Sequence, residues 1–321
     1  MGIQITIIGL DRVGLSLGMA LKNSKNPVTL VGFDIDTAIM KTAEKIGAVD
    51  KSVFNLHSAI DKADLVLLNL TGGETLEYAE DISSSLKEGA TLINLAPVHS
   101  AMCEWGKHHL PASRNMINAT PVLAGSMLDK EEPSAELFKG SIVLISSPPA
   151  TNASAIQLGV DLAGLLGASP LFSDPMEADG LLTMTDLFPR VVSFLVLQAA
   201  INQPGWMEAG KAAGPVFWQI SRPIGQFVSG KFAAREMLLQ KENVLRYLSL
   251  LQDEIDILQE AIQNGEEEKL QKNLQQCLDE QTLWLTKRSS GQWEKSAPEI
   301  KNAPTSGWKK LLGMETPGKK H

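Results

Sequence analysis

Short apolar runs alternate with amphipathic segments along the first half of the chain. The runs are four to six residues long, and such short apolar runs predict buried strands. Strands are predicted at Gln4–Ile8, Thr29–Phe33, Leu65–Leu70, Thr91–Leu95, Met116–Ala119 and Ser141–Ile145. Their alternation with helical patterns predicts a doubly wound, mostly parallel α/β sheet domain over residues 1–165.

The second half of the chain changes to a helical period. A first apolar helix is predicted over Thr185–Gln203, and one long helix over Lys231–Gln263. Apolar residues of the long helix recur every three or four positions: Val244, Leu248, Leu251, Ile255, Leu258 and Ile262. Asn264-Gly265 is predicted to end this helix, and Glu266–Lys287 to form a second one that returns along it. Residues 166–288 are therefore predicted to form an all-α domain.

The apolar seam of the long helix allows two interpretations. It can be buried within an intramolecular helical hairpin, or the hairpin can in addition pair with a second subunit. Beyond the hairpin, residues 289–321 combine Ser, Gly, Pro and Lys with few apolar residues. This composition predicts a disordered tail.

Composition narrows the class of protein. A net charge of −8 argues against a nucleic-acid-binding protein, because neutralising phosphates requires a basic face. The most apolar stretch, Val191–Ile201, is too short to span a membrane and is predicted to be a buried helix. The first apolar run lacks the basic flank of a signal peptide. Cys103 and Cys277 form no metal-binding pattern, so we expect a reducing, cytoplasmic location and no metal site.

The first forty residues carry the clearest chemical signal. A strand leads into Gly9-Leu-Asp-Arg-Val-Gly14 and a helix, and the next strand ends at Asp34, twenty residues after Gly14. This is the Rossmann-type dinucleotide-binding pattern, in which helix N-terminal amides face a pyrophosphate and a carboxylate holds the adenosine ribose. We expect Gly9 to form the tight turn, Gly14 to allow close helix–strand packing, and Ser16 to donate to a phosphate. Asp34 would repel a 2′-phosphate, so NAD is expected rather than NADP.

One position departs from this pattern, because Asp11 replaces the middle glycine. A carboxylate there adds bulk and negative charge close to the pyrophosphate. Arg12 could offset the charge, or Asp11 could turn outward, so we expect weaker cofactor binding but not its loss. Thr71, after the third predicted strand, and Asn94 are expected to lie against the nicotinamide. An ordinary strand-to-helix turn would explain Thr71 equally well. For the domain as a whole, the alternative to nucleotide binding is a Rossmann-like domain that has lost its ligand.

The motifs resemble those of the prephenate/arogenate dehydrogenase family. The resemblance covers roughly residues 3–285 and includes Ile8-Gly9-Leu10, Thr120-Pro121-Val-Leu-Ala-Gly125, Ala135-Glu-Leu-Phe138-Lys-Gly140, Asp174-Pro175-Met-Glu177-Ala-Asp179 and Leu-Phe188-Pro189. It implies a NAD-dependent oxidoreductase of tyrosine biosynthesis that oxidatively decarboxylates prephenate or arogenate. It also implies a homodimer formed through the all-α domain.

The positions that carry the family's chemistry are altered. Asp-Val-Gly-Ser-Val-Lys becomes Asn94-Leu-Ala-Pro97-Val-His99, and the histidine that accepts the substrate's proton becomes Thr120. A threonine hydroxyl does not titrate near neutral pH, and losing a positioned base costs roughly 10²–10⁴-fold in rate. Thr120 could still polarise the substrate oxygen, and His99 could act as the base if it lies near the nicotinamide. The alternative for His99 is an exposed loop histidine.

Arg190 and Arg222 are the candidates for binding an anionic substrate, since each lies beside a proline near a predicted helix start. A buried ion pair between helices is the alternative. Three hypotheses follow: a NAD-dependent dehydrogenase acting on prephenate, arogenate or another small anion; a non-catalytic NAD-binding dimer; and a different Rossmann-type reductase. The third would need a lysine in the first all-α helix, and Thr185–Gln203 contains none.

Overall fold

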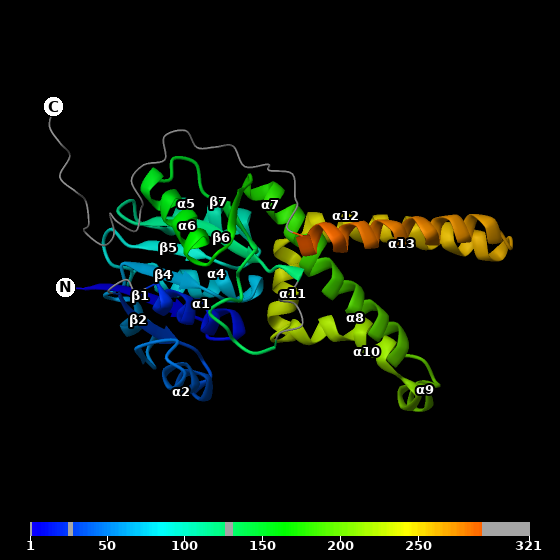
Figure 1. The fold of residues 1–321 in the computed structure, drawn as a ribbon, viewed down its shortest axis with the longest axis horizontal. Helices are drawn as coiled ribbons and strands as arrows, with labels where there is room; N and C mark the ends of the chain where they lie inside the picture. Colours follow the sequence, from blue (N-terminus) through cyan, green and yellow to red (C-terminus); the bar gives the residue numbers. More distant parts are fainter. Residues whose placement is uncertain (1, 25–27, 126–130, 291–321) are drawn as a thin grey trace.

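The N-terminal half of the chain is built on one sheet. The structure is a computed structural model, and it describes residues 2–24, 28–125 and 131–290. Within these ranges the strand order is β3-β2-β1-β4-β5-β6-β7-β8. Strands β1 to β6 run parallel, β7 pairs antiparallel with β6, and β8 pairs parallel with β7. The predicted doubly wound, mostly parallel sheet is confirmed (Figure 1).

All six predicted strands are present with ends shifted by a few residues. They are β1 (Ile3–Ile8), β2 (Val28–Phe33), β4 (Leu65–Leu68), β5 (Thr91–Asn94), β6 (Asn115–Val122) and β7 (Ile142–Ser146). The sequence pattern missed β3 (Lys51–Ser52), which is too short to show alternation, and β8 (Ser169–Phe172), which contains Pro170. Proline is tolerated in β8 because it is an edge strand. The sheet therefore extends beyond the predicted domain boundary at residue 165.

Helices cover both faces of the sheet because neighbouring residues of each buried strand point to opposite sides. Ile7 of β1 packs into one apolar core and Ile8 into the other. One face is covered by α1 (Arg12–Asn23), α2 (Thr37–Lys45) and α6 (Ala153–Leu165). The other face is covered by α3 (Leu56–Ile60), α4 (Gly72–Ile82) and α5 (His99–His109).

The second half is helical and extends from the sheet domain as two arms (Figure 1). One arm comprises α8 (Phe188–Ile201), α9 (Trp206–Ala212) and α10 (Pro215–Ser221), and the other is the hairpin of α12 (Lys241–Gln263) and α13 (Glu267–Ser290). Helix α7 (Pro175–Leu182), a π-helical turn (Thr183–Leu187), a 3-10 turn (Arg222–Gln226) and α11 (Gly230–Leu239) connect the arms to the sheet domain. The predicted all-α architecture and the hairpin are confirmed.

Two helix predictions need correction. The first apolar helix begins at Pro175 rather than at Thr185, and it includes the π-helical turn. The predicted single helix Lys231–Gln263 is wrong, because it breaks at Gln240 into α11 and α12. The backbone of Gln240 leaves the helical conformation, with φ −102° and ψ 25°. Its side chain is buried and donates a hydrogen bond to the Pro97 carbonyl in the sheet domain.

The apolar stretch Val191–Ile201 was predicted to be buried, and this is only partly correct. Val191 is buried, whereas Phe194 and Ile201 are 38% and 42% exposed. The continuous helical run Pro175–Ile201 is long and apolar enough to cross a membrane by length and composition alone. That is weak evidence, because core helices of soluble proteins pass the same test. The predicted tail, residues 289–321, lies outside the described residues except for the end of α13.

Candidate functional site

The turn between β1 and α1 requires glycine at two positions. Gly9 has φ +89°, and a Cβ atom on it would lie 1.9 Å from the backbone oxygen of Asn69. A Cβ atom on Gly14 would lie 2.0 Å from the backbone oxygen of Gly9. Both distances are too short for any side chain. The two glycines therefore bring α1 against the ends of β1 and β4, as predicted.

A cleft of about 330 Å³ opens at this turn, at the carboxyl ends of β1, β2 and β4. Four of the predicted cofactor residues line it together: Gly9, Asp11, Asp34 and Thr71. Asp36, which sequence reasoning expected to add to the repulsion of a 2′-phosphate, also lines it. Sequence reasoning missed the other lining residues, which are Ile8, Phe33, Ile35, Ile39, Asn69, Leu70, Glu74, Tyr78 and Val228. Ligands of open α/β sheets bind at this edge. The cleft thus has the position expected of a nucleotide site.

Asp34 is fixed at the end of β2 by two backbone amides. The Leu10 amide donates to its Oδ2 at 2.7 Å, and the Asp36 amide donates to its Oδ1 at 2.8 Å. Because each carboxylate oxygen has two lone pairs, both oxygens can still accept one further hydrogen bond. Two hydroxyl groups of a ribose would satisfy that remaining capacity.

Asp11 does not turn outward. Its Oδ1 accepts hydrogen bonds from the amides of Val13 and Gly14 at 2.9 and 3.0 Å and from Asn69 Nδ2 at 2.7 Å. Asp11 is therefore the N-cap of α1, and helix amides with no acceptor within the helix stabilise its charge.

Ser16 does not face the cleft. Its hydroxyl is fully buried, donates to the Arg12 carbonyl at 2.6 Å and accepts from the Ser134 amide at 3.0 Å. The predicted contact from Ser16 to a phosphate is not available in this position. Arg12 is the first residue of α1 and is not among the residues that line the cleft.

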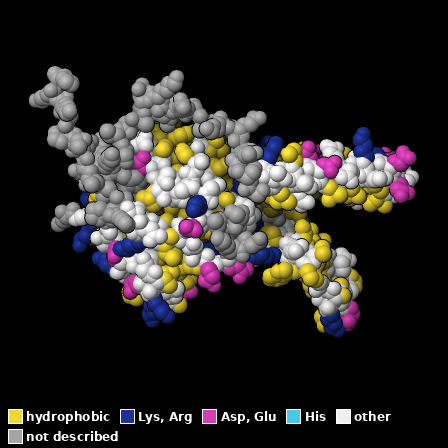
Figure 2. Space-filling model, in the orientation of Figure 1, with side chains coloured by type: hydrophobic (Ala, Val, Ile, Leu, Met, Phe, Trp, Pro, Cys, Tyr) yellow, Lys and Arg dark blue, Asp and Glu magenta, His cyan; other side chains and the backbone are white. Residues whose placement is uncertain are grey.

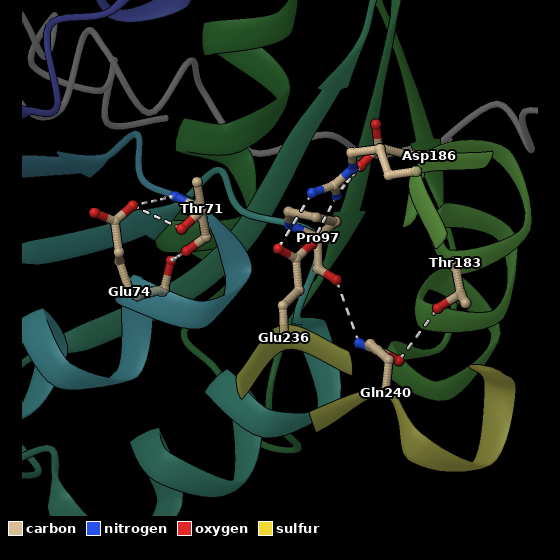
Figure 3. Close-up of polar contacts among 9 residues, drawn as sticks. Thr71, Glu74, Pro97, Thr183, Asp186, Glu236 and Gln240 are labelled. Atoms are coloured by element: carbon tan, nitrogen blue, oxygen red, sulfur yellow. Dashed lines mark hydrogen bonds and ion pairs between the residues drawn. The ribbon is translucent and has the colours of Figure 1, made fainter. Parts of the chain in front are cut away.

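Thr71 forms the N-cap of α4 through a capping box with Glu74 (Figure 3). Its amide and hydroxyl both donate to Glu74 Oε2, at 3.1 and 2.6 Å. Thr71 is thus an ordinary strand-to-helix cap and at the same time a wall of the cleft. Asn94 is fully buried and bonds to Ala96 and Asn118, so it does not reach the cleft.

His99 and Thr120 lie together in a buried polar network next to the end of β5. His99 is fully buried, so the exposed-loop interpretation is wrong, and its Nε2 lies 2.8 Å from Thr120 Oγ1. Its Nδ1 lies 2.8 Å from Ser146 Oγ, which in turn accepts from Asn118 Nδ2 at 3.1 Å. Ser146 could not be found from sequence, because the antiparallel pairing of β7 with β6 brings it there.

The hydrogen bonds assign the protonation of His99. The Thr120 hydroxyl donates to the Ala96 carbonyl at 3.1 Å, so its oxygen accepts the proton on His99 Nε2. Nδ1 then accepts from the Ser146 hydroxyl. Burial lowers the pKa of His99 to about 3. The imidazole is therefore neutral, and both of its nitrogens are occupied by protein groups.

Asp179 fixes the start of α5, the helix that begins at His99. The amides of His99 and Ser100 donate to its two carboxylate oxygens at 2.6 and 3.0 Å. Asp179 is 4% exposed, and burial raises its pKa above the usual range of an aspartate.

Comparisons with known proteins agree with this geometry. A family model described as "Prephenate dehydrogenase, nucleotide-binding domain" matches residues 17–169, a stretch that begins after Asp11. Prephenate dehydrogenase of Bacillus subtilis is 23% identical over 191 residues, 59% of this chain and 51% of the relative. Cyclohexadienyl dehydrogenase of Zymomonas mobilis is 24% identical over 195 residues, 60% of this chain and 66% of the relative.

Residues 17–169, just under half of the chain, therefore match the nucleotide-binding domain of the prephenate dehydrogenase family. The matches span about half to two thirds of the length of these curated relatives.

Solved prephenate and arogenate dehydrogenases share the fold of this chain. A prephenate dehydrogenase from A. aeolicus, described as a complex with hydroxyphenyl propionate and NAD+, has a TM-score of 0.75 and 20% identity, covering 88% of this chain and 98% of that one. An arogenate dehydrogenase from Synechocystis has a TM-score of 0.65 and 19% identity, covering 88% of this chain and 100% of that one. The similarity extends over the sheet domain and the helical domain.

The two arginines proposed for substrate binding have different surroundings. Arg190 is buried and bonds to Glu236 at 2.7 Å and Asp186 at 2.5 Å, so the ion-pair interpretation is correct for it. Although burial opposes the charge, these two carboxylates raise the pKa of Arg190. Arg222 is 56% exposed and lies 3.3 Å from Glu131.

Helix α11 joins the helical domain to the cleft (Figure 3). A Cβ atom on Gly73 of α4 would lie only 2.0 Å from the backbone oxygen of Phe232 in α11. The backbones of the two helices are therefore in close contact. One turn later, Glu236 packs on Gly72 while it binds Arg190. Gln240 then donates to the Pro97 carbonyl at 3.3 Å. The loops after β4 and β5 are thus held by one helix of the second domain.

Proposed function

We propose that the cleft binds NAD and that the protein is a NAD-dependent oxidoreductase of the prephenate dehydrogenase type. Its proposed substrate is a small anion, with prephenate or arogenate as the first candidates. The observation that carries this proposal is the placement of Asp34, whose carboxylate lies beside Gly9 and Leu10 at the end of β2. The names of the curated relatives and the NAD+ complex of the A. aeolicus enzyme support it.

The residues fit the adenosine half of NAD as they stand. Asp34 offers two acceptor positions to a ribose, and Phe33, Ile35 and Leu70 provide apolar walls. The pyrophosphate half fits once the Asp11 side chain rotates away from the amides of α1. Asp34 and Asp36 place two carboxylates where a 2′-phosphate would lie, which supports NAD over NADP.

Bound NAD would supply the hydride acceptor. The chain itself would hold the substrate, for which the exposed guanidinium of Arg222 is the proposed carboxylate ligand. Its 3.3 Å contact with Glu131 joins two exposed side chains, and such pairs exchange at little cost. Thr120 is the proposed hydroxyl for polarising a substrate oxygen, although its oxygen is engaged by His99 and Ala96.

A second candidate function is NAD binding without turnover. The arrangement of His99 favours it, because neither imidazole nitrogen has a free lone pair to accept a proton from a substrate. A general base must reach the proton that it removes. In this function the protein would be a redox sensor or a scaffold.

We further propose a homodimer in the cytoplasm. Apolar side chains remain exposed on both arms, and the surface is hollowed between the arms (Figure 2). They include Trp218, Leu258, Ile262, Leu274, Leu278 and Trp284. Exposed apolar surface of this extent typically marks an interface. Cys103 and Cys277 are free thiols, which suits a reducing compartment.

One pair of measurements tests these proposals. Isothermal titration calorimetry with NAD should detect binding, and Asp34→Asn should weaken it, because one of the two ribose-facing oxygens becomes a donor. Absorbance of the reduced cofactor is then followed with NAD and prephenate or arogenate. Turnover supports the dehydrogenase, whereas NAD binding without turnover supports the second candidate. If no heat is detected with NAD or NADH at millimolar concentration, both functions are wrong.

The altered residues give a sharper assay. Thr120→His alone would place a second ring against His99, so the variant to test combines Pro97→Ser, His99→Lys and Thr120→His. Oxidation of prephenate or arogenate by this variant alone would show that the pocket is intact and only the base is missing. Binding of NAD without oxidation would show that the substrate pocket has also changed.

A further inference from the structure

The carboxylate of Asp11 lies where a pyrophosphate would bind. The first amides of a helix have no acceptor within the helix, and in dinucleotide-binding folds they are the groups that bind phosphate. Here Oδ1 of Asp11 accepts from two of them, those of Val13 and Gly14. The third donor to the same oxygen is Asn69 Nδ2, which extends from the loop after β4.

Asn69, which follows the neighbouring strand β4, holds the Asp11 carboxylate and the glycine turn together by hydrogen bonds. Its side-chain amide donates to Asp11 and also to the Gly9 carbonyl at 3.1 Å, and its backbone amide donates to the Ile8 carbonyl at 2.8 Å. The carboxylate is thus bound by three donors, two from α1 and one from a side chain fixed to the turn. A phosphate oxygen approaching this point would need the same donors.

The charge around the cleft acts in the same direction. Its lining residues include four carboxylates, on Asp11, Asp34, Asp36 and Glu74, and none of the lining residues is basic. A dinucleotide would bring its two phosphate charges among them, whereas adenosine would bring none. Like charges within a few ångströms disfavour each other.

We propose that Asp11 is an internal occupant of the pyrophosphate subsite, which a dinucleotide must displace, so that the pyrophosphate of a dinucleotide adds little to the affinity of its adenosine half. This inference rests on the proposed function, in which the cleft receives an adenine nucleotide. Adenosine leaves the three hydrogen bonds of Asp11 in place. NAD breaks them and gains the amides of α1 in exchange, so its pyrophosphate adds little affinity.

Removing the Asp11 side chain should raise the affinity for NAD and lower the stability of the unliganded protein. Removing the Asp11 side chain frees the amides for phosphate but leaves α1 without its cap when no ligand is bound. Asp11→Ala should therefore bind NAD about five- to tenfold more tightly, which is the affinity equivalent of one N-cap. Its affinity for adenosine should not change, and the unliganded protein should melt at a lower temperature.

Two matched variants distinguish the helix-capping role of Asp11 from the effect of its negative charge. Asp11→Asn keeps a side-chain oxygen that can cap the helix and removes the charge, so it should keep the melting temperature and gain part of the NAD affinity. Asp36→Asn removes a charge from the same cleft without touching α1, because Asp36 caps α2 through the Ala38 amide. It should change NAD affinity less than Asp11→Ala does.

The test is calorimetry with NAD and with adenosine on the wild-type protein and the three variants, together with thermal unfolding without ligand. In the wild type the two dissociation constants should agree within about tenfold, and Asp11→Ala should tighten NAD binding but not adenosine binding. The inference alone is overturned if wild-type protein binds NAD far more tightly than adenosine, or if Asp11→Ala changes neither constant. If neither ligand binds any of the four proteins, the proposed function is overturned as well.

Discussion

The imidazole Nε2 of His99 lies 2.8 Å from the hydroxyl oxygen of Thr120. These are two of the positions at which the chain departs from the family pattern that it resembles, which has a lysine and a histidine there. The structure places the two substituted residues against each other, so the ring at position 99 fills space beside the smaller residue at position 120. The pair replaces a titrating group with a closed hydrogen-bonded network.

The buried His99 predicts a specific pH dependence of stability. Its folded pKa is about 3, below the ordinary value of 6.5 that it regains on unfolding. Between these values the unfolded chain binds a proton that the folded one does not, so this contribution to stability is lost as pH falls below 6.5. One unit below, at pH 5.5, His99 should cost about 1.4 kcal/mol relative to neutral pH.

The measurement is urea unfolding at pH 7.5 and 5.5 for the wild type and for His99→Gln, which cannot titrate. The variant is expected to be less stable at pH 7.5 but to lose less on acidification. His57→Gln provides the same substitution at an exposed histidine, which hydrogen-bonds to Ser85, and it should leave the stability at pH 7.5 nearly unchanged. Equal losses for wild type and His99→Gln would contradict the prediction.

Glu236 should be essential for stability only while Arg190 is present. Glu236→Leu leaves a buried guanidinium with one remaining carboxylate partner, Asp186, which is 47% exposed. Breaking a buried pair on one side costs about 3 kcal/mol or more, so urea unfolding of this variant should shift to much lower concentration.

The double variant Arg190→Met with Glu236→Leu is the control, because it removes both charges and keeps apolar volume. It should recover most of the lost stability, since replacing a buried ion pair with apolar residues is often nearly neutral. A double variant as unstable as Glu236→Leu would show that the ion pair itself holds α11 in place.

Sequence reasoning was most accurate where the determining residues are neighbours in the chain. The unit from Ile3 to Asp34 is local, so its glycines and its acidic strand end could be placed from spacing alone. The partner of His99 could not, because Ser146 arrives through an antiparallel strand 47 residues later. The pair of Arg190 and Glu236 is likewise separated by 46 residues and two helices.

Asp11 shows a different limit of sequence reasoning. Its identity as a departure from the glycine pattern was evident, yet whether its carboxylate turned outward or toward α1 depended on local geometry. The free amides of Val13 and Gly14 and the side chain of Asn69 decide that question. The break at Gln240 was also hidden, since glutamine is a good helix former and only its contacts with other elements explain it.

The seam of the helical hairpin predicts a concentration-dependent assembly. Leu258 is 50% exposed and Ile262 is 60% exposed in the single chain, although both belong to the apolar repeat of α12. Leu258→Glu should therefore weaken the proposed homodimer while leaving the monomer folded, because a charge would be buried at the interface.

Sedimentation velocity over a range of protein concentrations measures this. Gln259→Glu adds the same charge at the next position of the same helix, outside the repeat, and should leave assembly unchanged. A wild-type protein that sediments as a monomer at every concentration would rule out the homodimer.

The contact between Gly73 and Phe232 should be the most sensitive point in the joint between the two domains. A methyl group on Gly73 would lie 2.0 Å from a backbone oxygen that cannot rotate away, so α4 and α11 would have to separate. Gly73→Ala should destabilise the protein by about 2–4 kcal/mol, as overpacking of a close backbone contact does. It should also weaken NAD binding, because α4 and its N-cap carry Glu74 and Thr71 at the edge of the cleft.

Gly164→Ala is the matched control, since Gly164 lies in α6 with no atom within 4 Å of the added methyl group. It should leave NAD binding unchanged and raise stability by about 0.5–1 kcal/mol, and a similar result for Gly73→Ala would mean that the helices tolerate the separation.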